Sequence, residues 1–144
     1  MMQLTMTGEY AVRAMVHLAG VPSGGIVQIT DIAREWDIPE SFLRKIIAKL
    51  SRAELVESRR GNGGGVLLAQ DPNTLTLLDV IEAVEGKIAL NKCMIAPGTC
   101  HRDPWCKVHR VWCKAQMLLR DTLSSSTLAQ LALLPSDGGA SHKP

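Results

Sequence analysis

The most restrictive feature of this sequence is a glycine-rich segment, Arg59–Gly65, that lies between two short apolar runs. Four of its seven residues are glycine and one is asparagine, so it cannot hold a regular helix or strand. The flanking runs, residues 55–58 and 66–69, are rich in Leu and Val, and each has the length of a short strand. Two strands joined by a glycine-rich tip predict a β-hairpin that carries two arginines at its turn.

Three helices are expected before this hairpin. Apolar residues recur at helical spacing over residues 5–20, 30–36 and 39–53, with Pro and Gly between the segments. Aromatic residues make up only 3% of the chain, so the core must be mainly aliphatic, which favours helices over a β-sandwich.

Three helices followed by a hairpin is the order of a winged helix-turn-helix. In that arrangement the second helix of the pair enters the DNA major groove with its first residues at base edges. The hairpin, or wing, can place arginine in a minor groove. The predicted DNA contacts are therefore Ser41 and Arg44 at bases, Lys45 and Lys49 at phosphates, and Arg59 and Arg60 on the wing.

The local charge supports a DNA partner better than the overall charge does. The whole chain has a formal net charge of only +2. Residues 44–60 contain six basic and two acidic side chains, a net of +4, whereas residues 71–90 contain four acids and one lysine, a net of −3. A basic helix face is by itself most often only a solvated surface, and a glycine-rich turn can be simply flexible. Together and in this order, they favour double-stranded DNA.

The second half of the chain predicts more helix around a cysteine-rich loop. A helix is expected over residues 75–85 with Gly86 as its cap, and another from Pro104 to about Thr122. Trp105, Val108, Trp112, Ala115, Leu119 and Thr122 follow the alternating three- and four-residue steps of a coiled coil. The expected fold is mainly α with a small β-hairpin wing: a winged helix-turn-helix (1–86), a cysteine-rich loop (87–106), a dimerisation helix with a C-terminal helix (104–134) and a flexible tail (135–144).

All four cysteines lie between positions 93 and 113, in the order Cys93-x6-Cys100-x5-Cys106-x2-His109 and then Cys113. Three thiolates and an imidazole can complete a four-ligand site, and such soft donors suit an iron–sulfur cluster or zinc. Paired Cys-x2-Cys hooks are missing, so the loose spacing fits a cluster better than a closed zinc site. Thiol redox chemistry and inert cysteines remain open from spacing alone.

Several other classes of protein are not expected. There is no apolar run long enough to span a membrane, and Glu9, Arg13 and His17 interrupt the apolar N-terminal segment, so we expect no signal peptide and a cytoplasmic location. No catalytic triad order or cofactor fingerprint is found, so we do not expect an enzyme. A cluster-free protein that uses the helix-turn-helix for protein contacts is the alternative from another class.

Three segments, residues 4–15, 38–43 and 49–65, and the cysteine loop together carry a family resemblance. Over about residues 2–134 the chain resembles the IscR/NsrR family of bacterial winged-helix regulators. It implies a transcriptional regulator, acting as a repressor, that forms a homodimer through the long helix. It also implies that the state of an iron–sulfur cluster alters operator affinity in response to cluster supply, redox state or nitric oxide.

The resemblance further implies which residues hold the cluster. Cys93, Cys100 and Cys106 match the three shared cysteines, and His109 matches the fourth ligand of the IscR branch. In the NsrR branch the fourth ligand is a carboxylate near the N-terminus of the other subunit, where Glu9 stands here. A 2Fe-2S cluster is favoured over 4Fe-4S.

Two features depart from the family pattern. Six residues instead of five separate the first two cysteines, and Cys113 is additional, so Cys113 is a further candidate for fourth ligand. Some members of the family lack a cluster. The alternative function is thus a cluster-free regulator that acts through zinc, thiol oxidation or a protein partner.

Overall fold

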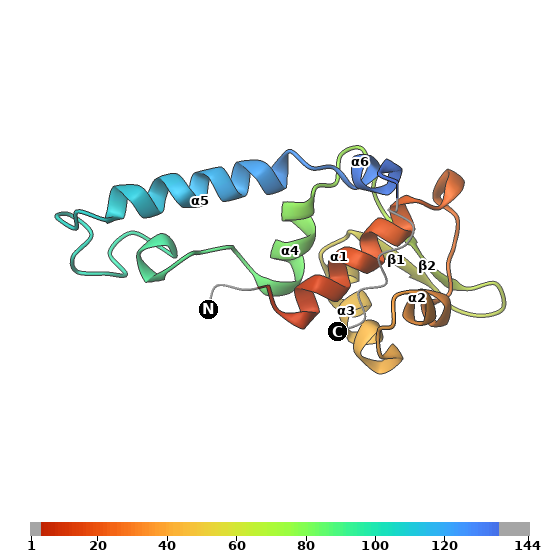
Figure 1. The fold of residues 1–144 in the computed structure, drawn as a ribbon. Coiled ribbons are helices and arrows are strands. Elements are labelled where there is room, and N and C mark those ends of the chain that lie inside the picture. The colour runs from red at the N-terminus through yellow and green to blue at the C-terminus, as the bar shows by residue number, and fades with distance from the viewer. Residues whose placement is uncertain (1–3, 136–144) are drawn as a thin grey trace.

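The computed structural model describes residues 4–135 and is mainly helical with one antiparallel hairpin, as the sequence predicts. Its elements are α1 (Met6–Ala19), η1 (Pro22–Gly24), α2 (Ile29–Glu35), α3 (Glu40–Arg52), β1 (Val56–Arg59), β2 (Gly65–Leu68), α4 (Leu77–Glu85), η2 (Lys92–Met94), α5 (His109–Ser124) and α6 (Leu128–Leu133). Figure 1 shows two regions: a packed body and an arm, residues 87–124, that projects from it with the loop at its far end. The predicted tail lies outside the described residues apart from Pro135.

An aliphatic core holds the body together. The helix α1 packs against α3, α4 and α6, and α3 also packs against α2. On α3 the buried residues are Leu43, Ile46, Ile47 and Leu50, the three- and four-residue spacing that predicted this helix. Each fully buried Leu or Ile contributes about 1.5–3 kcal/mol by leaving water. No polar or charged side chain is buried among the described residues, so burial of apolar surface accounts for the packing.

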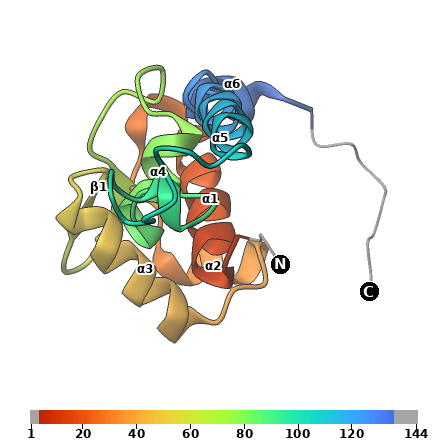
Figure 2. The same cartoon turned by 90° about the vertical axis from the view of Figure 1, so that its left-hand side faces the viewer.

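The chain returns to the body after the arm. Thr76 and Thr127 each begin a helix with a capping box, and the two residues face each other in an isolated β-bridge. Leu128 of α6 is fully buried in the core. Figure 2, which looks along α5, shows α6 behind it beside the body. Both ends of the arm are therefore attached to the body.

The helix of the arm begins later than predicted. It begins at His109, not at Pro104, and residues 100–108 form turns in which the amide of Cys106 donates to the Arg102 carbonyl at 2.8 Å. The prediction failed because Trp105 and Val108 are 68% and 54% exposed, and a helical turn without packing is marginal in water. Cys106 thus lies in a turn before α5, whereas the sequence placed it on the helix.

No helix in the described part of the chain is both long and apolar enough to cross a membrane.

Candidate DNA interface and metal-binding loop

A groove of about 530 Å³ runs between the hairpin and α3, the recognition helix, which is the helix predicted to enter the DNA major groove. Three of the predicted DNA contacts, Arg44, Arg59 and Arg60, line it, together with Gln28 and Thr30 from the start of α2. Residues that are 16 positions apart in sequence thus face one concave, positively charged surface.

The position of the wing is fixed by a close backbone approach. Val27 and Val66 exchange both amide hydrogen bonds, at 2.8 and 2.7 Å, which ties β2 to the segment before α2. Next to this bridge, a Cβ on Gly65 would lie 2.4 Å from the Val27 carbonyl oxygen, and the residue has φ +156°. Only glycine fits at this position, so the sequence that shapes the wing also attaches it to the helix-turn-helix.

The basic residues differ in how they are paired. Arg44 forms an ion pair with Glu40 at 2.6 Å, and Arg59 forms one with Glu57 at 3.4 Å. Arg60 is exposed and has no ion pair with any of residues 4–135. Its guanidinium is therefore free to meet a phosphate or a base without first leaving a carboxylate.

The remaining predicted contacts lie outside the groove. Ser41 and Lys45 are exposed on α3. The ammonium of Lys49 donates to the Val84 carbonyl at 3.4 Å, near the C-terminal end of α4. There the charge meets the negative end of the α4 dipole, so Lys49 supports the packing of α3 on α4.

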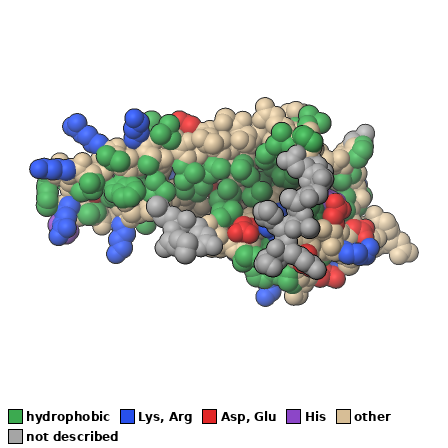
Figure 3. Space-filling model, viewed as in Figure 1, with side chains coloured by type: hydrophobic (Ala, Val, Ile, Leu, Met, Phe, Trp, Pro, Cys, Tyr) green, Lys and Arg blue, Asp and Glu red, His purple; other side chains and the backbone are tan. Residues whose placement is uncertain are grey.

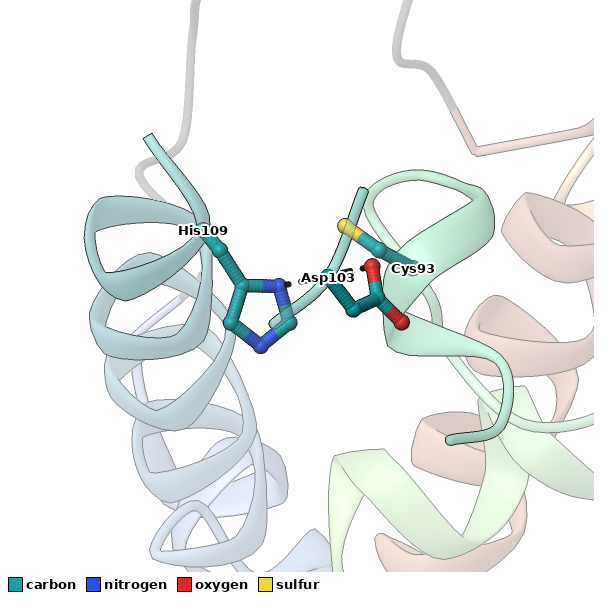
Figure 4. Close-up of side chains that lie close together, drawn as sticks. All are labelled: Cys93, Asp103 and His109. Atoms are coloured by element: carbon teal, nitrogen blue, oxygen red, sulfur yellow. Dashed lines mark ion pairs between the residues drawn. The ribbon is translucent and has the colours of Figure 1, made fainter. Parts of the chain in front are cut away.

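The tip of the arm brings two predicted ligands, Cys93 and His109, together with an acidic residue that was not predicted, Asp103. The Cys93 thiol, the Asp103 carboxylate and the His109 imidazole each place one ligand atom within 4.8 Å of the other two (Figure 4). Cys93 comes from η2, Asp103 from the turns and His109 from the first residue of α5. One feature of the sequence could have marked Asp103 as a candidate ligand: it is the only acidic residue between Glu85 and Asp121.

Both nitrogens of His109 face specific groups. Its Nδ1 atom is buried, has no hydrogen-bond partner in the described structure and lies 3.8 Å from Asp103 Oδ1. Its Nε2 atom lies 3.4 Å from the Cys113 thiol, one turn further along α5. An unpartnered ring nitrogen facing a thiol and a carboxylate is the arrangement of an imidazole available to a metal.

The other three thiols lie outside this group. All four cysteines are free and partly buried. Partial burial raises the pKa of the Cys93 thiol, and the Asp103 carboxylate and the Cys100 and Cys106 thiols raise it further. The structure therefore brings Cys93 and His109 together but does not place Cys100 and Cys106 within the three-residue group.

The donor set at the arm tip fits an iron–sulfur cluster chemically, because three thiols and an imidazole with an unpartnered nitrogen share one loop. Glu9, a further candidate for the fourth ligand besides Cys113, forms an ion pair with Arg13 at 3.6 Å on its own helix.

Comparison with known proteins gives a consistent result. The model of the Rrf2 family, described as an iron-dependent transcriptional regulator, matches residues 4–133. A candidate HTH-type transcriptional regulator of Neisseria meningitidis is 34% identical, over 98% of this chain and 95% of its own length. One of Azotobacter vinelandii is 36% identical, over 90% of this chain and 79% of its own length.

Two solved structures of bacterial regulators have a similar fold. CymR, the global cysteine regulator of B. subtilis, is 28% identical with a TM-score of 0.73, covering 92% of this chain and 97% of its own. IscR of T. potens is 30% identical with a TM-score of 0.73, covering 90% and 85%.

Proposed function

This chain belongs to the Rrf2 family of transcriptional regulators, and from that premise we propose that it is a cytoplasmic, homodimeric DNA-binding repressor controlled by an iron–sulfur cluster. The observation that supports the proposal most directly is that one chain carries both a candidate DNA-binding groove and a candidate cluster-binding loop. A basic groove lies in the body, and a loop of soft ligands lies at the tip of an arm attached to that body.

The groove supplies DNA binding in the proposed function. Arg44 at the start of the recognition helix and Arg60 on the wing line one surface, so major- and minor-groove contacts can form together. Ser41 and Lys45 extend the exposed face of α3 toward neighbouring bases and phosphates. Most of the affinity then comes from phosphate contacts, and it should fall as salt rises.

The arm supplies the dimer interface. No residue of α5 is buried, and Val111 and Leu118, which are seven positions apart and so lie on one side of the helix, are 64% and 58% exposed. Hydrophobic side chains run along the arm in the space-filling view, and Lys and Arg side chains gather at its tip (Figure 3). A second α5 packed on this apolar side would remove it from water and set the spacing of the two recognition helices.

The cluster site consists of Cys93, Cys100, Cys106 and His109, with a 2Fe-2S cluster favoured over 4Fe-4S. A bound cluster supplies a redox-active group that reacts with oxidants and nitric oxide. Cys93 lies in η2, and Cys100 and Cys106 lie in the turns before α5. A cluster held by all three would tie these segments together, so its binding or loss would change how well the arm tip is ordered. The Arg120–Glu82 ion pair and the hydrogen bond from the Leu90 amide to Gln116 connect α5 to α4 and to the loop. A change in α5 is thereby passed to the body.

The first test is anaerobic purification followed by a visible spectrum and assays for iron and acid-labile sulfide. Brown protein with both elements in stoichiometric amounts supports the proposal. The Cys100→Ala and Cys106→Ala variants should lose this absorbance, and the intact protein should bind DNA with different affinity before and after cluster removal. A Cys100→Ala variant with an unchanged spectrum would refute the ligand assignment.

A cluster-free regulator that acts through thiol oxidation, zinc or a protein partner is the second candidate. Two observations favour the thiol form: the structural similarity to a cysteine regulator, and a Cys113 thiol in contact with His109. The thiol mechanism would replace the cluster mechanism if the protein stayed colourless after reconstitution and its DNA affinity changed on oxidation and recovered on reduction.

A further inference from the structure

Asp103 occupies an unusual position among the charges of the arm. Between Glu85 and Asp121 it is the only acid, and seven Lys and Arg residues share that segment with it. The ion pairs of residues 4–135 nevertheless include none between Asp103 and a Lys or Arg. Its carboxylate, only 16% exposed, instead faces the imidazole of His109 and the thiol of Cys93 (Figure 4). A carboxylate that avoids neighbouring cations and faces a thiol and an imidazole is placed as a metal ligand.

The three groups together match the ligand preferences of one cation. Zinc binds thiolate, imidazole and carboxylate, with bonds of about 2.0–2.3 Å, so tetrahedral donors lie roughly 3.4–3.6 Å apart. Here the Asp103 oxygen and His109 Nδ1 are 3.8 Å apart, and all three donor atoms lie within 4.8 Å of one another. A closure of about an ångström in a loop of turns would bring them to bonding distance.

The charges also balance. One thiolate and one carboxylate carry two negative charges, which neutralise a divalent cation, and a neutral imidazole completes the set. The Cys93 thiol now donates to the Asn91 side-chain oxygen at 3.0 Å, and it would release its proton to solvent as the sulfur–metal bond forms.

Cys113 orients the histidine in this arrangement. With its sulfur 3.4 Å from Nε2, it can accept the Nε2–H hydrogen, which leaves the lone pair of Nδ1 directed at Cys93 and Asp103. Metal-bound histidines usually donate their other ring N–H to such a partner. In this arrangement Cys113 is a positioning residue, because it orients the His109 ring.

We propose that, in the cluster-free protein, Cys93, Asp103 and His109 bind a single Zn²⁺, with the fourth position open to water. The site goes beyond the regulatory function proposed above, because it uses Asp103 and leaves Cys100 and Cys106 unbound. Since it shares Cys93 and His109 with the cluster ligands, zinc and cluster exclude each other.

The test is a titration of the full-length, reduced, cluster-free protein with Co²⁺, a spectroscopic substitute for zinc, followed by displacement with Zn²⁺. We expect one equivalent of tetrahedral Co²⁺ with a charge-transfer band of the intensity of one thiolate. Cys93→Ser should remove that band, and Asp103→Asn should weaken binding at least 10-fold. Cys100→Ser and Cys106→Ser should leave the charge-transfer band and the Co²⁺ affinity unchanged. Asp121→Asn is the matched control for the removal of a carboxylate.

Three results would overturn the proposal: a band with the intensity of two or three thiolates, unchanged affinity in Asp103→Asn, or displacement of Co²⁺ by Fe²⁺ in preference to Zn²⁺. Circular dichroism of Asp103→Asn establishes that the variant is folded. The outcome is separate from that of the cluster proposal, because Cys100→Ser and Cys106→Ser should abolish the cluster spectrum while they preserve the cobalt spectrum.

Discussion

The body and the arm of this molecule are built on different principles. Among residues 4–135, every buried hydrophobic residue lies in the body, between Ala11 and Val84 or at Leu128, whereas α5 contains no buried residue over 16 positions. The body is held by its own aliphatic core. The arm has only partial packing, one ion pair to Glu82 and several exposed apolar side chains.

The difference shows where the molecule can respond to a signal. A close-packed core resists small changes, because each lost contact has a cost. Segments with few buried contacts open with a low free energy and are the ones that a ligand or partner can order. The arm, which carries the thiols, is therefore the region whose structure depends on what binds to it.

The largest expected effect tests the core directly. Leu50→Ala removes a fully buried side chain of α3, and we expect it to lower the free energy of unfolding by about 2–5 kcal/mol. Leu133→Ala is the control, because that side chain is 85% exposed and should change stability by no more than about 0.5 kcal/mol. Urea denaturation measures both, and equal effects would mean that the core is not where the structure places it.

A charge on the arm should separate subunits without unfolding the body. Leu118→Glu places a carboxylate on the exposed apolar side of α5, and we expect the proposed dimer to dissociate at least about 100-fold more readily, the order of loss when a charge is buried at an interface. Sedimentation equilibrium gives the dissociation constant. Ser124→Glu, at the end of the helix, is the control. A dimer that survives Leu118→Glu would place the interface elsewhere.

Removing one guanidinium from the wing should affect DNA binding alone. Arg60→Ala should weaken binding about 10-fold to a sequence selected from random DNA, the loss typical of one arginine contact. The control Arg102→Ala removes an exposed arginine from the arm tip and should have little effect. Fluorescence anisotropy at fixed salt measures both affinities. If Arg102→Ala were the weaker binder, the arm and not the wing would contact DNA.

The smallest effect tests the connection between the two regions. Arg120→Ala breaks the partly buried ion pair between α5 and Glu82, which should be worth about 1 kcal/mol. We expect amide hydrogens of α5 to exchange about 5-fold faster, while α3 keeps its protection. Exchange measured by mass spectrometry resolves the two helices. Unchanged exchange in α5, or the same increase in Arg110→Ala, would show that this pair does not anchor the arm.

The sequence by itself determined the body. The three- and four-residue spacing on α3 and the glycine-rich turn of the wing specify local structure directly, because helix periodicity and turn conformation are properties of consecutive residues. The helix α3 and the hairpin, and the positions of Arg44, Arg59 and Arg60 on them, therefore follow from the order of residues alone.

Only the tertiary structure decided the arrangement of the arm tip. From the sequence, Cys106 was predicted to lie on a helix and Asp103 was not predicted as a ligand. The spacing of residues along the chain specifies neither where α5 begins nor which groups an isolated acidic residue faces. The start of α5 depends on whether Trp105 and Val108 find packing, and they are exposed instead. The grouping of Asp103 with Cys93 and His109 depends on how the turns before α5 are placed against η2, and the spacing of the three residues does not specify that placement.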